Sequence, residues 1–205
     1  ESFVDEIAFA AKADPVEFRL KHLENPRDIA AIKAAAERSG WKYGPAGARR
    51  GRRGDMVTGQ GIAYARRNGT IVALVANVEV NTRTGAIRVP KITCAHDCGL
   101  VINPETLKLT LEASIVQGLS RAIHEEVRFD KRNVTSIDWQ TYPIVEIQDA
   151  PEIDLVILNY PDQEALGAGE SAMRPLIGAV ANAVFEATGK RFRRAPVNSA
   201  NILRS

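Results

Sequence analysis

Apolar positions in the first forty residues recur at helical spacing. The first helix is indicated by apolar residues that share one face: Phe3, Ile7, Ala8 and Ala11. A second helix is predicted to start at Asp14-Pro15, because aspartate caps helix N-termini and proline is tolerated at the first helical position. The break at Asn25-Pro26 separates it from a third helix. We therefore expect residues 1–41 to form a helical segment.

The pattern changes to that of β-strands from residue 59 onward. Residues 71–80 form an apolar, β-branched run, a turn at 81–85 ends in glycine, and a second apolar run follows. Two such runs joined by a short turn predict a hairpin over residues 71–96. Pro90 within the second run predicts a bulge or a sheet edge there. Weaker strand patterns lie at 127–129 and 153–158.

Two longer helices are predicted in the second half of the chain. Asn103-Pro104 is an N-terminal capping pattern, and apolar residues then recur every four positions: Leu107, Leu111, Ile115, Leu119 and Ile123. The last helix covers about residues 172–188, with Gly189 as its C-terminal cap. Small residues such as Gly118 would let these helices approach closely. The expected fold class is α+β: an N-terminal helical segment, then a mixed β-sheet with two longer packed helices.

Residues 42–58 are rich in glycine and arginine and are interpreted as an exposed linker. Its arginines are Arg49, Arg50, Arg52 and Arg53. They could contact phosphate groups, but no aromatic residues are interleaved for base stacking, so a solvated loop is favoured. The predicted organisation is a helical segment (1–41), the linker (42–58), an α+β domain (59–197) and a tail (198–205).

Composition and charge exclude several classes of protein. The chain has 205 residues with 27 basic and 25 acidic side chains, a net charge of +2, so there is no global case for nucleic-acid binding. It contains no apolar run long enough to span a membrane. The sequence starts with Glu1, already in a helical pattern, so we expect a piece of a longer protein. The cellular compartment is left open.

The two cysteines flank a histidine: Cys94, His96 and Cys98 alternate along the chain. In a strand these three side chains would share a face, which is one possible start of a metal site. The spacing is not a standard zinc motif, so a strand end with small, partly buried thiols is favoured and no metal ligand is assigned. Two cysteines are also too few for a disulfide-dense scaffold.

Glu170 is the main candidate for a chemical role. It follows Gly167 and Gly169, whose small size allows a sharp turn and the close approach of a ligand. A carboxylate beside a close-packed ligand can act as a general base if burial raises its pKa. Spacing alone favours a simpler interpretation, a carboxylate stabilised by the helix dipole.

Several segments together resemble one family. Residues 97–104 match its Asp-x-Gly-x-x-x-Asn-Pro motif, and residues 167–171 (Gly-Ala-Gly-Glu-Ser) are similar to the segment that holds its catalytic glutamate. Residues 116–120 and 175–184 are similar to two of its helices. The chain thus resembles the C-terminal part of the molybdenum-binding large subunit of the xanthine oxidase and aldehyde oxidase family, isoquinoline 1-oxidoreductase β-subunit type.

This resemblance implies a molybdenum hydroxylase that oxidises an aldehyde or N-heterocycle with water as the oxygen source. Glu170 matches the family's general base. The family's cofactor is a molybdenum-pyranopterin, often extended as a cytosine dinucleotide, and Gly167, Gly169, Thr110 and Gln117 match positions near it. The implied partners are the remainder of the large subunit, an iron–sulfur subunit as electron acceptor and a small-molecule substrate.

Two departures from the family pattern leave an alternative open. Thr110 stands where the family usually has glutamine, and Ala113-Ser114 replaces its Gly-Gly pair. The alternative is a non-catalytic scaffold or assembly domain with a degenerate cofactor face. On either interpretation we expect the isolated piece to be inactive and to bind no cofactor, since the family's cofactor loop lies upstream.

Overall fold

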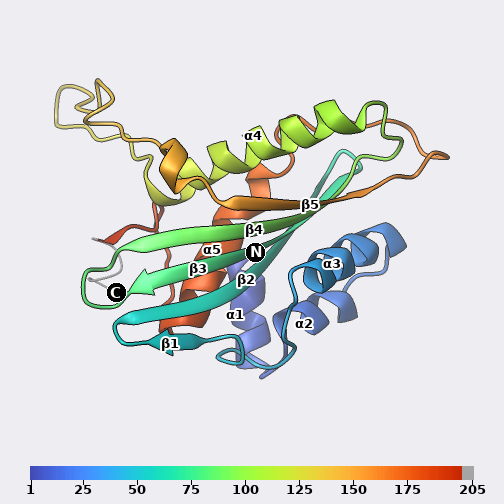
Figure 1. Ribbon diagram of the computed structural model, residues 1–205, viewed down its shortest axis with the longest axis horizontal. Coiled ribbons are helices and arrows are strands. Elements are labelled where there is room, and N and C mark those ends of the chain that lie inside the picture. The colour runs from blue at the N-terminus through green and yellow to red at the C-terminus, as the bar shows by residue number, and fades with distance from the viewer. Residues whose placement is uncertain (200–205) are drawn as a thin grey trace.

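A five-stranded sheet organises the computed structural model, which describes residues 1–199 (Figure 1). The strands lie in chain order: β1 (Gly51–Arg53), β2 (Met56–Arg67), β3 (Thr70–Asn81), β4 (Ile87–Asp97) and β5 (Glu152–Leu158). The first four pair antiparallel, whereas β5 runs parallel to β4. The sheet is therefore mixed, and the predicted α+β class is confirmed.

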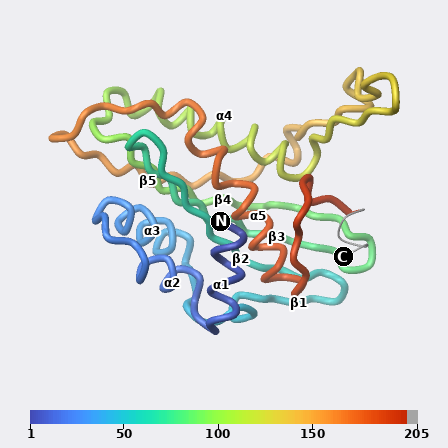
Figure 2. Tube along the Cα trace, turned by 180° about the vertical axis from the view of Figure 1, so that it is seen from behind, coloured from blue at the N-terminus to red at the C-terminus, as the bar shows by residue number. Residues whose placement is uncertain are grey.

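Helices cover both faces of this sheet (Figures 1 and 2). The helices are α1 (Ser2–Ala10), α2 (Pro15–Lys21), α3 (Pro26–Arg38), α4 (Pro104–Ile123) and α5 (Met173–Thr188), with a short 3₁₀ turn, η1, at Ile147–Asp149. α2 and α3 pack on one face of the sheet, and α4 and α5 pack on the other. α1 lies against α2 and α5.

Strand β3 is buried on both faces, and for this reason its sequence does not alternate between apolar and polar residues. Val72, Leu74 and Ala76 join the core beneath α4 and α5, whereas Ile71 and Ala73 join the core beneath α2 and α3. Successive side chains of a strand point to opposite faces, so a strand buried on both faces reads as a continuous apolar run.

The predicted helix starts and the hairpin are confirmed. The Asp14 carboxylate accepts the N–H groups of Val16 at 2.7 Å and Glu17 at 3.1 Å, and Asn103 accepts the N–H of Thr106 at 3.0 Å. β3 and β4 form the expected hairpin, and the bulge predicted near Pro90 appears as a register shift between Asn77 and Glu79.

The prediction of a solvated loop is wrong for Arg49. This residue is only 8% exposed, and its guanidinium pairs with Asp14 and with Glu186, each at 3.2 Å. The two carboxylates come from distant parts of the chain, so the sequence pattern alone does not reveal that they meet. Residues 51–53 form β1 and β2 begins at Met56, although the division of the chain at 42–58 into domains stays a prediction.

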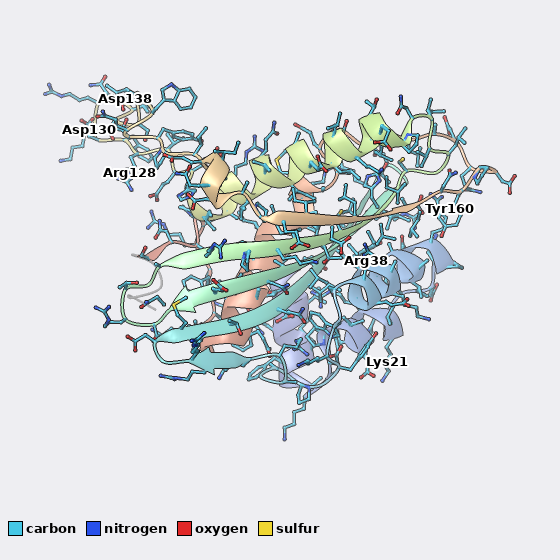
Figure 3. The ribbon with its side chains drawn as sticks, viewed as in Figure 1. Lys21, Arg38, Arg128, Asp130, Asp138 and Tyr160 are labelled. Carbon is cyan, nitrogen blue, oxygen red and sulfur yellow. The ribbon has the colours of Figure 1, made fainter. Side chains whose placement is uncertain are left out.

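The segment between α4 and β5 extends away from the sheet at the end opposite to Tyr160, and Arg128, Asp130 and Asp138 lie on it (Figure 3). Of the strand predicted at 127–129, a single bridge forms, between Phe129 and Val134. The predicted tail falls largely on residues 200–205, outside the described part of the chain. Within residues 1–199, no helix combines the length and hydropathy that a membrane crossing requires.

Candidate functional site

Glu170 lies in a small open hollow where the β2–β3 turn meets the start of α5. The hollow has a volume of about 220 Å³. Its walls combine charged, polar and glycine residues: Arg67, Asn68, Thr70, Gly167, Gly169, Glu170, Ser171 and Arg174. The structure thus brings Gly167, Gly169 and Glu170 together with two guanidinium groups and an amide.

A tight turn presents Glu170 to the solvent. The carbonyl of Ala168 accepts hydrogen bonds from the backbone N–H of Ser171 at 3.4 Å and from its hydroxyl at 2.9 Å. Gly169 and Glu170 therefore occupy the two central positions of a β-turn. The side chain of Glu170 is exposed, and within residues 1–199 it has no hydrogen-bond or ion-pair partner.

The segment on either side of this turn is tied to three other parts of the chain. The Thr70 hydroxyl at the start of β3 donates to the Gly167 carbonyl at 2.8 Å, and the Leu166 N–H donates to the Cys98 carbonyl at 2.9 Å. After the turn, the N–H of Met173 donates to the Ser114 hydroxyl of α4 at 3.1 Å. The backbone that carries Glu170 is therefore fixed while its carboxylate stays free.

His96 also contacts the turn, from strand β4. Its Nε2 lies 2.8 Å from the Ser171 hydroxyl. The imidazole is fully buried, and this burial lowers the pKa of His96 from its ordinary value of 6.5 to about 4. His96 is therefore neutral at neutral pH, because a buried charge loses its hydration.

The metal interpretation of the Cys94, His96 and Cys98 pattern gains no support. Within residues 1–199 there is no group of three or more histidine, cysteine or acidic side chains that could hold a metal ion. Both thiols are free and buried, and burial raises the pKa of Cys94 to about 12. A buried thiol with so high a pKa stays protonated when no cation lies beside it.

The predicted close approach of the two longer helices is found at Gly118. A methyl group added there would lie 2.8 Å from Leu176 Cδ2 and 3.1 Å from Met173 Cα. Only a residue without a side chain lets α4 approach the first turn of α5 so closely. Together with the Ser114 contact, this packing sets where α5 begins.

The other two predicted cofactor residues lie on α4, outside the hollow. The Thr110 hydroxyl donates to the Thr106 carbonyl of its own helix at 2.8 Å, and Gln117 is exposed. Neither lines the hollow around Glu170.

The sequence pattern does not identify Arg67, Asn68, Thr70 or Arg174 as members of this site, and it presents His96 only as a possible metal ligand. A polar residue within an otherwise apolar strand is the available signal for His96, whereas the other four carry no distinctive pattern.

Comparisons with known proteins agree on one family. The sequence profile of the molybdopterin cofactor-binding domain matches residues 8–151, a range that ends before Glu170. The chain is 40% identical over 210 residues to a subunit of nicotinate dehydrogenase from Pseudomonas putida, an alignment that covers 98% of this chain and 18% of the relative. It is 35% identical over 201 residues to the β-subunit of isoquinoline 1-oxidoreductase from Brevundimonas diminuta, covering 98% of this chain and 25% of that one.

Two solved structures are similar to part of this chain. Quinoline 2-oxidoreductase from Pseudomonas putida 86 superposes with a TM-score of 0.62 at 28% identity, covering 66% of this chain and 18% of that one. The aldehyde oxidoreductase from Desulfovibrio gigas gives 0.59 at 26% identity, covering 66% and 15%. The chain spans 18% and 25% of the length of the two curated relatives.

Proposed function

Because the chain belongs to the molybdopterin cofactor-binding domain family of the xanthine oxidase and aldehyde oxidoreductase large subunits, we propose that Glu170 is the general base of a molybdenum hydroxylase. The proposed substrate class is an aldehyde or an N-heterocycle, oxidised with water as the oxygen source. The observation that carries this proposal is a carboxylate that is free at the tip of a fixed turn.

The residues of the hollow fit an anionic, oxygen-rich cofactor. A methyl group added at Gly167 or Gly169 would meet nothing within 4 Å, so the backbone there is open to a ligand. Arg67 and Arg174 supply guanidinium donors, which suit phosphate oxygens, and Asn68 supplies an amide. These residues would hold one side of a molybdenum-pyranopterin in its dinucleotide form. When bound, this group supplies the two-electron oxidation of the substrate carbon.

Glu170 would accept the proton that is released when water becomes the oxygen nucleophile. Proton transfer requires a base whose position is set before the substrate arrives, because misplacement by a fraction of an ångström lowers the rate. The hydrogen bonds to Ala168 and Gly167 provide this positioning without engaging the carboxylate itself. The carboxylate of Glu170 would therefore already be in place when the proton is released.

A separate redox subunit would remove the electrons. An iron–sulfur cluster generally needs four protein ligands, whereas this chain has two cysteines, both buried. Relatives of this chain are themselves named as subunits of larger enzymes. We therefore propose that the electrons leave through an iron–sulfur centre outside this chain, on the partner subunit that the family resemblance implies.

The test is the variant Glu170→Gln in the complete enzyme. The amide keeps the size of the side chain but cannot act as a base, so kcat should fall by about 10²–10⁴-fold. The molybdenum and pterin contents should stay at the level of the parent enzyme, because Glu170 makes no hydrogen bond or ion pair within residues 1–199.

The matched control is Glu164→Gln, which removes the same charge from an exposed residue of the preceding loop. Its kcat should equal that of the parent. Parent-like turnover of Glu170→Gln would contradict the assignment.

A non-catalytic scaffold is the second candidate function, and the contact of Ser114 favours it. Ser114 is one of the positions that depart from the family pattern. Its hydroxyl accepts the N–H of Met173, so this residue serves a contact within the fold rather than a cofactor contact. Metal analysis of the complete protein purified with its partner separates the two functions. A scaffold would contain no molybdenum, whereas the hydroxylase would contain one equivalent per subunit.

A further inference from the structure

A buried imidazole lies directly beneath the turn that presents Glu170. His96 belongs to β4, where it is paired with Val72 of β3 on one side and Ile157 of β5 on the other. It is 0% exposed, and its Nδ1 has no hydrogen-bond partner within residues 1–199. Burying a polar ring with one nitrogen unpaired costs free energy, and the single hydrogen bond of Nε2 offsets only part of that cost. Such a residue calls for an explanation.

The hydrogen bonds around Ser171 select one tautomer of His96. The Ser171 hydroxyl has a single proton, which it donates to the Ala168 carbonyl at 2.9 Å. It therefore accepts a hydrogen bond from His96 Nε2–H, at 2.8 Å. The unpartnered Nδ1 then carries a lone pair rather than a proton, which is the less costly arrangement because a carbonyl or ring lone pair is more easily left unpaired than a buried N–H.

His96 differs from the other anchors of this segment in where it attaches. Thr70 and Cys98 bind the backbone before the turn, at Gly167 and Leu166, and Ser114 binds it after the turn, at Met173. His96 instead binds the Ser171 hydroxyl, the group that closes the turn through its hydrogen bond to Ala168. Within the described residues, no other side chain from outside the turn binds this hydroxyl. The ring thereby orients the hydroxyl that holds the two ends of the Ala168–Ser171 turn together.

We propose that His96 is a positioning residue for Glu170: it fixes the Ala168–Ser171 turn through Ser171 and so sets the place of the carboxylate. This proposal rests on the proposed role of Glu170 as the base. It assigns a use to a residue whose alternation with two cysteines suggests a metal ligand. The imidazole stays at a distance from the chemistry and acts through the backbone of the turn.

The test compares two substitutions at position 96 in the complete enzyme. His96→Leu removes the donor and keeps an apolar side chain of similar size, whereas His96→Gln offers an amide N–H close to the place of Nε2. In His96→Leu we expect kcat to fall by about 10–100-fold with little change in KM, since small displacements of a catalytic group have effects of this size. His96→Gln should recover most of the lost kcat.

A second readout does not depend on activity. Hydrogen exchange of the amide of Ser171, followed by mass spectrometry of a peptide covering residues 166–173, should be faster in His96→Leu and close to that of the parent in His96→Gln. Cys94→Ala, which removes buried volume from the same strand, is the matched control and should leave this exchange unchanged. Equal exchange in His96→Leu and the parent would overturn the proposal.

Combination with Glu170→Gln distinguishes a positioning role from a general loss of structure. If His96 acts through Glu170, then His96→Leu should reduce kcat no further in a Glu170→Gln background. Likewise, the double variant of Ser171→Ala and His96→Leu should lose no more kcat than either single variant. A full additional loss in the Glu170→Gln background would overturn the proposal. Parent-like activity of Glu170→Gln alone would refute the role of the base, while the exchange experiment would still test the contact of His96 with the turn.

Discussion

Arg49 lies between two carboxylates and an indole ring in the interior of the protein. Its guanidinium pairs with Asp14 and Glu186, and its Cζ lies 4.3 Å from the centre of the Trp41 ring. Asp14 in turn caps α2 and Glu186 belongs to α5, so one side chain joins these two helices. The residue therefore stabilises the relative position of two parts of the chain.

Loss of Arg49 should be strongly destabilising. Arg49→Met removes the charge and leaves two buried carboxylates without their partner, which should lower the free energy of unfolding by about 3–5 kcal/mol. The measurement is urea unfolding of the complete protein. Arg52→Met, at an exposed position of β1, is the control and should change the free energy of unfolding by less than about 0.5 kcal/mol.

His96 should make stability depend on pH in a defined window. Its pKa is about 4 in the folded protein against an ordinary value of 6.5, so between these values the unfolded chain binds more protons than the folded one. The free energy of unfolding should therefore fall as the pH decreases from 6.5 to about 4, by about 3 kcal/mol in total. His96→Gln should lack this component, as measured by unfolding at a series of pH values. An identical pH dependence of parent and variant would contradict it.

At the scale of elements, α5 rests directly on the backbone of β2. A methyl group added at Gly59 would lie 2.5 Å from the Ala183 carbonyl, and one added at Gly61 would overlap the backbone at Ala179 and Ala183. The Asn182 amide donates to the Ile62 carbonyl at 2.9 Å across this contact. The two glycines thus set the distance between the sheet and the helix that follows Glu170.

The substitution Gly61→Ala should therefore separate α5 from the sheet. Because backbone atoms cannot move aside as a flexible side chain can, we expect the free energy of unfolding to decrease by about 3 kcal/mol. Thermal unfolding of the complete protein measures this effect. Gly167→Ala, where the added methyl group meets nothing within 4 Å, is the control for the substitution itself and should unfold close to the parent temperature.

At the scale of the whole molecule, the sheet with helices on both faces presents a site that is open on one side. The hollow around Glu170 has a volume of about 220 Å³, and Glu170 itself is exposed. Large apolar side chains are exposed on the segment between α4 and β5 as well, among them Phe129, Trp139 and Ile147. Exposed apolar groups in such number are typical of surfaces that contact other polypeptide.

The 205-residue chain by itself should not retain the molybdenum cofactor. Sites that hold small molecules enclose about 70–90% of the ligand surface, and one open wall encloses much less. Metal analysis of the purified chain should find no stoichiometric molybdenum, whereas the complete large subunit should contain it. Stoichiometric molybdenum in the isolated chain would show that this wall alone is sufficient.

Local interactions explain the parts of the fold that the sequence predicted. Asp14 and Asn103 cap helices within three residues of themselves, and the spacing of Leu107 to Ile123 depends on a single helix. The β3–β4 hairpin joins neighbouring segments, so its pattern is readable without knowledge of the rest. Glu170 is different, because its spacing alone favours a helix-dipole role and only the resemblance to the family's catalytic segment suggests a base.

The sequence by itself therefore determined the helices and the hairpin, because these depend on residues close together along the chain. Only the tertiary structure decided which distant residues meet: Arg49 with Glu186, His96 with Ser171, and Arg67 with Arg174 in one hollow. The same holds for the pairing of β5 with β4, which are separated by α4 and the extended segment. Such contacts follow from packing across two faces of one sheet, and no local pattern encodes them.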